Sequence, residues 1–167
     1  MKIAPELVVT KWLNTNENLS LEKLRGKVIA IHTFQMLCPG CVLHGIPQAQ
    51  KVSAIFDPDH IVVLGLHTVF EHHEGMQEKS LSAFLHEFRV RFPVAIDKPS
   101  DQQSIPQTMR LYDMQGTPSW LLIDRDGNLR HHIFGQIEDM TIGSEITKLA
   151  LENQNKNINI FRKNEGA

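Results

Sequence analysis

The sequence of 167 residues predicts an α/β domain in which helices cover both faces of a mixed central sheet. Three observations lead to this fold class. Ile61–Leu66 is a continuous apolar run, typical of a strand that is buried on both faces of a parallel sheet. Lys27–Phe34 has the pattern of another buried strand and precedes apolar residues at helical spacing, which gives a β-α-β unit. An apolar strand ending at Asp124 then leads through Asp-Arg-Asp-Gly into Leu129–Phe134, which predicts an antiparallel hairpin.

In the first third of the chain we expect an edge strand of the sheet and a helical turn, followed after the central strand by a longer helix. Leu7–Leu13 alternates between apolar and polar residues, which predicts a short edge strand. Ser20–Leu24 followed by Gly26 fits one helical turn that glycine ends. After the central strand, the helical pattern continues to about Ala54, and Pro47 inside it removes an N–H group and predicts a kink.

The middle and the end of the chain alternate helices with short strands. Val69–Gln77 is polar and rich in histidine, so we expect a loop there. Residues 81–88 have the spacing of an amphipathic helix, and 93–96 form a short strand. A short helix is expected over 106–112, because proline suits a first helical position, and a last helix over 142–150.

Composition is that of one globular domain. Hydrophobic residues make up 41% and charged residues 22% of the chain, which suits a single core over 1–151 and a polar C-terminal tail over 152–167. The net charge of −2 gives no reason to expect nucleic acid or a membrane as a partner. Met1–Thr10 lacks the pattern of a signal peptide, so a cytoplasmic location is expected, provided that no leader was removed.

The two cysteines of the chain, Cys38 and Cys41, lie where the central strand passes into its helix. Pro39 suits the first helical position, which puts Cys38 at or just before the helix N-terminus. Unpaired backbone N–H groups and the helix dipole favour a thiolate at such a position. A lone Cys-x-x-Cys beside a β-α-β pattern is typical of a redox-active dithiol.

Two other readings of the cysteines stay open, inert buried thiols and a zinc site that includes His44. A structural zinc site takes four ligands, and the sequence offers no second Cys/His pair at short spacing. The adjacent pairs His72–His73 and His131–His132 point in different directions and read as solvated surface histidines. We therefore expect no metal and no cofactor.

The Cys38-Pro39-Gly40-Cys41 motif, the later Thr117-Pro118 and the Asp-x-x-Gly hairpin together resemble the thioredoxin fold, a three-layer sandwich. The extra strand, loop and helix between Ile61 and Ile96 resemble the TlpA/ResA-type redoxin branch (AhpC/TSA-related), which includes the thioredoxin-like module of NHL-repeat proteins. The resemblance covers roughly residues 5 to 150.

This resemblance implies that Cys38 is the nucleophile and Cys41 the resolving thiol. It also implies a cis Thr117–Pro118 bond that faces the dithiol, although an ordinary edge-strand proline is the other reading of Pro118. The expected substrate-binding residues are Leu37, Pro39, Gly40, Thr117 and Pro118.

The chain departs from the family pattern around the dithiol. Leu37 replaces the usual Trp before the first cysteine, and Pro47 lies six residues past the second cysteine instead of five. His44 stands where TlpA-like proteins have an acid, and His32 stands at the position of the buried acid beneath the second cysteine. His32 is either a catalytic base for the Cys41 proton or a hydrogen-bonded core histidine.

The expected function is thiol–disulfide oxidoreduction, with a disulfide-containing protein or a small thiol as substrate and an upstream thiol reductant. A redox-responsive binding module is the non-enzymatic alternative, with Val69–Gln77 as the partner surface. A thiol peroxidase is the other enzymatic alternative. The peroxiredoxin pattern has Pro and Thr where this chain has Ile31 and Gln35, which argues against it.

Overall fold

The computed structural model describes residues 2–154 and 158–163. Within these residues a seven-stranded mixed sheet has the order β1-β7-β6-β3-β4-β5-β2. The strands are β1 (Lys2–Ile3), β2 (Val9–Leu13), β3 (Val28–Phe34), β4 (Ile61–His67), β5 (Val94–Asp97), β6 (Ser119–Ile123) and β7 (Asn128–Phe134).

The predicted β-α-β unit and hairpin form the centre of this sheet. β3 pairs in parallel with β4 and antiparallel with β6, and β6 pairs antiparallel with β7. β2 is an edge strand on β5, as expected, while β1 on β7 was not anticipated. The helical elements are η1, a π-helical turn (Cys41–Gly45), α1 (Ile46–Ile55), η2, a 3-10 turn (His73–Met76), α2 (Glu78–Glu87), α3 (Gln107–Leu111) and α4 (Asp139–Leu151).

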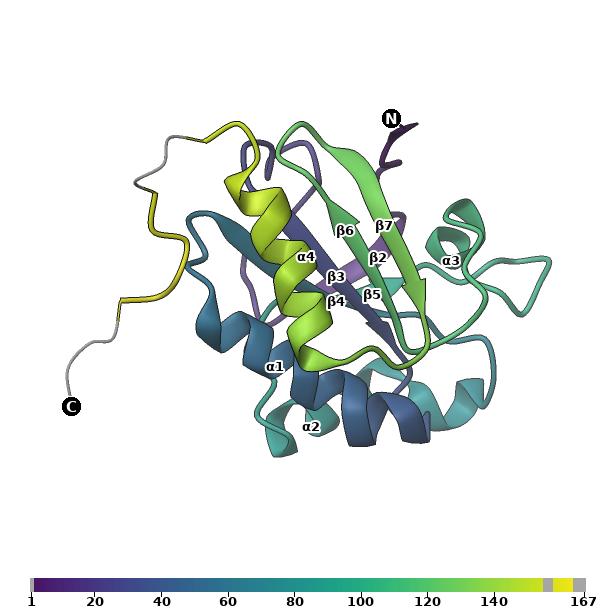
Figure 1. Cartoon of the computed structure of the whole chain (residues 1–167). Helices are drawn as coiled ribbons and strands as arrows, with labels where there is room; N and C mark the ends of the chain where they lie inside the picture. Colours follow the sequence, from purple (N-terminus) through teal and green to yellow (C-terminus); the bar gives the residue numbers. More distant parts are fainter. Residues whose placement is uncertain (1, 155–157, 164–167) are drawn as a thin grey trace.

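Alternation along β3 separates two hydrophobic cores, because successive strand residues face opposite sides of the sheet. Val28, Ala30 and Phe34 pack with residues of α1, α2 and α4. Ile29 and Ile31 pack with residues of α3 and of the N-terminal segment. Figure 1 shows α1 and α4 crossing the same face of the sheet. The sandwich with helices on both faces is thereby confirmed.

Two expected helices differ in the structure. Ser20–Leu24 forms hydrogen-bonded turns instead of a helix. The helix after the dithiol is a π-helical turn followed by α1, and Pro47 lies at the start of α1 instead of kinking its interior. A π-helical turn holds more residues than an α-helical turn, which fits the sixth-residue spacing of Pro47.

The tail that was expected to be polar and at the surface is partly buried. Ile160 is 1% exposed and packs in the core beside α1 and α4. Its carbonyl accepts a hydrogen bond of 2.9 Å from Asp57 N–H, and Phe161 stacks on Phe56 with ring centroids 5.5 Å apart. The expectation of a surface tail is wrong for this segment, because Ile160 is buried in the core and Ile158 packs against it. Residues 155–157 and 164–167 of the tail lie outside the described residues.

The part of the chain that the structure describes has no helix long and apolar enough to span a membrane.

Candidate active site

The dithiol lies where β3 passes into helix. Helical backbone begins at Pro39, so Cys38 is the residue directly before it, as the sequence predicted. Cys38 N–H donates to the Gln35 carbonyl at 3.1 Å, and Val42 N–H donates to the Cys38 carbonyl at 3.0 Å. These bonds fix the Cys38 backbone at the start of the helix.

The two sulfur atoms have different surroundings. Cys38 is half-buried, and its Sγ lies 3.4 Å from Cys41 N–H and 3.6 Å from the Thr117 carbonyl. A backbone donor aimed at sulfur is a partner for a thiolate. Cys41 is buried, and burial, followed by its hydrogen bond with Cys38, raises the pKa of its thiol to about 12. Cys41 is therefore a thiol at neutral pH.

The Thr117–Pro118 peptide bond is cis, as the resemblance implied. Pro118 packs against the dithiol loop, since a Cβ placed on Gly40 would lie 3.4 Å from Pro118 Cδ. The Pro118 carbonyl accepts Gly135 N–H at 2.8 Å. The structure thus brings Thr117 and Pro118 beside Cys38 and Gly40, although the two pairs are distant in the sequence.

Leu37 and Pro39 form an exposed rim around the dithiol. The Leu37 side chain is 52% exposed. A Cβ placed on Gly75 would lie 3.2 Å from Leu37 Cδ1, so η2 packs against this rim. The histidine-rich segment is therefore adjacent to the dithiol, and it includes the short turn η2 as well as loop.

His32 lies in the core beneath the helix that carries Cys41. A Cβ on Gly45 would come within 2.5 Å of His32 Cε1 and 3.2 Å of Pro118 Cβ, so the ring fills the space above Gly45. The Trp120 ring lies 5.0 Å from the imidazole. Burial lowers the pKa of His32 to about 3. Among the described residues no protein group hydrogen-bonds to either ring nitrogen of His32.

His44 is exposed one helical turn beyond Cys41 and shares a hollow of about 210 Å³ with His32 and Pro118. Glu138 and Asp139, at the start of α4, also line this hollow. No cluster of three or more His, Cys, Asp or Glu side chains with a metal-binding arrangement occurs in the described residues.

Sequence reasoning missed two polar residues beside the dithiol. His67 is buried opposite Phe34 in the β3–β4 register, and its Nε2 accepts Met36 N–H at 3.2 Å. Burial lowers the pKa of His67 to about 4, which leaves it neutral. Gln35 is also buried and bonds to the segment after β4. Both residues follow apolar strand runs, and that position was the available signal.

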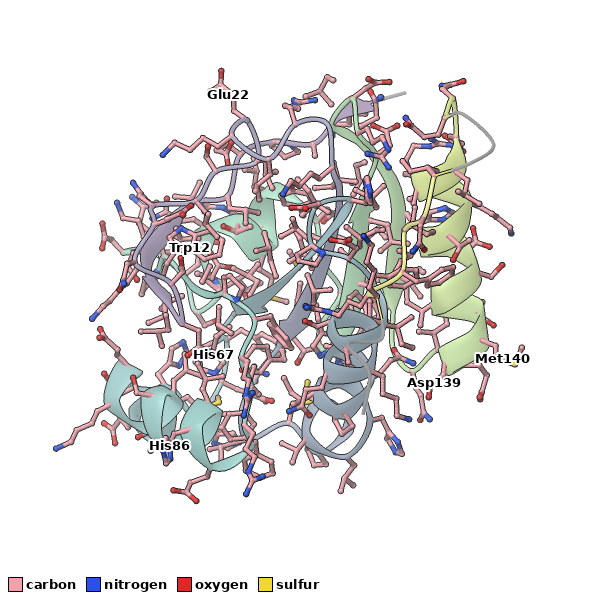
Figure 2. All side chains as sticks on the ribbon, turned by 90° about the vertical axis from the view of Figure 1, so that its left-hand side faces the viewer. Trp12, Glu22, His67, His86, Asp139 and Met140 are labelled. Carbon is pink, nitrogen blue, oxygen red and sulfur yellow. The ribbon has the colours of Figure 1, made fainter. Side chains whose placement is uncertain are left out.

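A third missed contact fixes α1 against the start of α4. Trp120 Nε1–H donates to Gln48 Oε1 at 2.8 Å, and Gln48 Nε2 donates to Asp139 Oδ1 at 2.9 Å. Asp139 in turn pairs with Lys51 at 2.7 Å. Figure 2 shows Asp139 and Met140 at the end of α4 nearest to α1. This chain of contacts holds the wall of the hollow beside His32.

The chain is similar to proteins of known structure over most of its length. A thioredoxin-like superfamily protein is 56% identical, with a TM-score of 0.89, over 91% of this chain and 98% of that one. A thiol-disulfide isomerase from Corynebacterium glutamicum is 49% identical, with a TM-score of 0.86, over 89% of this chain and 96% of that one. No protein-family model matches the sequence.

Curated proteins are more distant. NHL repeat-containing protein 2 of Gallus gallus is 26% identical over 84% of this chain, which spans only 22% of that protein. The thiol-disulfide oxidoreductase ResA of Geobacillus kaustophilus is 24% identical over 79% of this chain and 67% of that one. With a relative 56% identical over nearly its whole length, the chain belongs to the thioredoxin-like superfamily.

Proposed function

We propose that the protein is a thiol–disulfide oxidoreductase that works through the Cys38–Cys41 dithiol. One observation carries the proposal: a half-buried sulfur at a helix start receives a backbone N–H, while the second sulfur is buried three residues on. The accessible sulfur can attack, and the buried one can only react with its neighbour. Similarity to a thiol-disulfide isomerase at 49% identity supports the same class of reaction.

The reaction proceeds in two exchanges. The Cys38 thiolate attacks one sulfur of a substrate disulfide, so a mixed disulfide forms and the other substrate sulfur leaves as a thiolate. Cys41 then loses its proton and attacks Cys38 Sγ, which releases the second substrate thiolate. The substrate gains two electrons and the protein holds a Cys38–Cys41 disulfide. An upstream dithiol reductant restores the starting state by the reverse chemistry, and in a reducing cytosol the net direction is reduction.

His32 is proposed to assist the second exchange. Cys41 has a raised pKa, so it needs a proton acceptor as it attacks. The His32 imidazole is neutral at physiological pH, because burial lowers its pKa to about 3, and both ring nitrogens are free of partners within the described structure. So weak a base does not keep the proton at neutral pH, so we expect His32 to pass it to the departing substrate thiolate as the Cys38–Cys41 bond forms.

Replacing His32 by Gln tests this role, because the amide keeps much of the volume but is no base. We expect slower resolution of the mixed disulfide and a changed pH–rate profile in stopped-flow measurements. The role is falsified if His32→Gln keeps both the reduction potential and the pH dependence of disulfide exchange.

The substrate is proposed to bind as an extended segment beside Thr117 and Pro118. A segment there can pair with the backbone as an added strand, the mode in which main-chain hydrogen bonds give affinity. The exposed side chains of Leu37 and Pro39 also border the dithiol, and Gly40 packs against Pro118. A disulfide-containing protein or a small disulfide is the proposed substrate.

Reduction of insulin by dithiothreitol tests the function. We expect many turnovers per protein molecule, lost in Cys38→Ser. A protein that reacts once and then stops would instead be a redox-responsive binding module. The reduction potential distinguishes the direction, since values near about −270 mV favour a reductase and values near about −120 mV an oxidant.

A further inference from the structure

Gln35 connects three parts of the site through hydrogen bonds. The side chain is 1% exposed and follows the last residue of β3. Its backbone carbonyl accepts Cys38 N–H at 3.1 Å, and its side-chain Oε1 accepts Phe70 N–H at 3.1 Å. Gln35 therefore ties the segment after β4 to the loop that carries the nucleophile.

The side-chain nitrogen of Gln35 completes the connection. Gln35 Nε2 lies 3.4 Å from Glu71 Oε1 and 3.5 Å from Thr117 Oγ1. A primary amide has two N–H donors, so it can donate to both oxygens at once. The Thr117 carbonyl is also the acceptor for Cys38 Sγ–H at 3.6 Å. One buried amide thus holds the Glu71 carboxylate at a set position relative to Thr117 and Cys38.

Glu71 gives this side of the site a negative charge. Its side chain is exposed, while the amide that holds it is neutral and buried. On the other side of Pro118, Lys51 and Asp139 form an ion pair of 2.7 Å, and Glu138 lines the same hollow. On the Thr117 side, Glu71 is the carboxylate that Gln35 holds, and no basic side chain of the described residues offsets its charge by a salt bridge.

We propose that Glu71 makes the site selective for disulfides flanked by basic residues, and that Gln35 is the positioning residue that holds Glu71 there. The proposal rests on the function proposed above and adds the substrate class. A Lys or Arg beside the reacting cysteine is attracted by Glu71, and a Glu or Asp in the same place is repelled. Exposed charge pairs are weak, so we expect about a fivefold preference at low salt.

Two cyclic peptides test the proposal, each closed by one disulfide and differing only in Lys or Glu beside the cysteines. We expect kcat/KM for reduction of the Lys peptide to exceed that of the Glu peptide by about fivefold. The preference disappears in Glu71→Gln and shrinks as salt is added, because ions screen exposed charges. Equal rates with the wild type, or an undiminished preference in Glu71→Gln, would overturn the proposal.

Glu22→Gln is the matched control, since it removes the same charge elsewhere. Glu22 is exposed, and Figure 2 shows it at the top of the molecule, away from His67, which ends β4 beside the dithiol loop. We expect this variant to keep the full preference. If it loses the preference as Glu71→Gln does, net charge is the cause and Glu71 has no special role.

Gln35→Ala tests positioning. Without the amide, Glu71 is no longer fixed, so we expect the Lys-peptide preference to fall and the loss to lie in KM more than in kcat. An equal fall for both peptides, confined to kcat, would contradict a positioning role for Gln35.

A binding measurement separates this proposal from the proposed function. Linear, labelled peptides with Ser in place of Cys are titrated by fluorescence anisotropy, so that no exchange occurs. If neither disulfide is reduced but the Lys peptide still binds about fivefold tighter through Glu71, the function is wrong and the binding preference holds. If both cyclic peptides are reduced and the two linear peptides bind equally, the proposed function holds and the preference for basic residues is wrong.

Discussion

Cys38 and Cys41 are three residues apart, yet burial and a backbone N–H separate their chemistry. Cys38 is at the helix start and partly open, so it can meet a substrate. Cys41 is covered, and burial raises its pKa to about 12. The proposed roles of Cys38 as nucleophile and Cys41 as resolving thiol rest on this difference.

His32 gives a prediction for how the unfolding free energy depends on pH. Burial lowers its pKa from 6.5 to about 3, so the folded chain keeps it neutral where the unfolded chain protonates it. Above pH 6.5 the imidazole is neutral in both states. As the pH falls toward 3, the unfolded chain binds a proton that the folded chain does not, so the unfolding free energy falls. We expect His32→Gln to flatten the fall in unfolding free energy between pH 6.5 and 5, by up to about 1.4 kcal/mol per pH unit.

Urea unfolding at several pH values measures this slope. His67 contributes a slope of the same sign, because burial lowers its pKa to about 4, so part of the acid sensitivity stays. His86→Gln, at an exposed position on α2, is the control for loss of an imidazole outside the core. An unchanged slope in His32→Gln would mean that the imidazole is not buried in a neutral form.

Among single residues, cysteine positions and the cis-proline site were predictable, whereas Gln35 was not. Cys-x-x-Cys is a local motif whose chemistry is evident in the sequence, and the cis Thr117–Pro118 bond was implied by the family resemblance. Gln35 acts through Phe70, Glu71 and Thr117, which only the folded sheet brings near. Its place after an apolar strand gave no sign of those partners.

Among the elements beside the dithiol, η1 was not predicted from the sequence. Apolar spacing after Cys41 indicated a single helix, and a π-helical turn has no hydrophobic pattern of its own to reveal it. The displaced Pro47 was the available signal. This turn brings Gly45 against His32, where a side chain larger than hydrogen has no room.

Gly45→Ala should destabilise the protein for this reason. A Cβ there would lie 2.5 Å from His32 Cε1, so we expect a loss of about 1 to 3 kcal/mol in unfolding free energy. Gly143→Ala in α4 meets nothing within 4 Å and should stabilise by about 0.5 to 1 kcal/mol.

The double variant His32→Ala/Gly45→Ala shows whether the clash is the cause. Removing the ring makes room for the new methyl group, so the two costs should sum to more than the cost of the double variant by about 1 kcal/mol. Guanidinium unfolding measures all three variants. Costs that add within about 0.5 kcal/mol would show that His32 and Gly45 are not in contact.

For the whole molecule, the β-α-β unit and the hairpin were predictable, and the return of the chain end was not. The apolar run of β4 and the hairpin of β6 and β7 are local patterns that specify their own pairing. Ile160 lies in an Asn- and Lys-rich stretch, where the apolar residues Ile158, Ile160 and Phe161 are too few to indicate a helix or a core strand. Only the groove beside α1 and α4 gives it a place in the core.

Ile160→Ala tests whether this segment belongs to the cooperative fold. Because the side chain is 1% exposed, we expect a loss of about 2 kcal/mol or more in unfolding free energy, measured by chemical denaturation. Gln154→Ala, at an exposed position, should change it by less than about 0.5 kcal/mol. Equal small effects of the two substitutions would show that residues near 160 add little to stability.

Trapping of mixed disulfides tests the central claim, that Cys38 attacks and Cys41 resolves. Cys41→Ser and Cys38→Ser are each mixed with a disulfide-bonded protein, and covalent complexes are counted on a non-reducing gel. In Cys41→Ser the first exchange occurs but cannot be resolved, so the account predicts a stable complex that dithiothreitol releases. In Cys38→Ser the remaining thiol is buried, so none is predicted. Complexes formed by Cys38→Ser and not by Cys41→Ser would contradict the account.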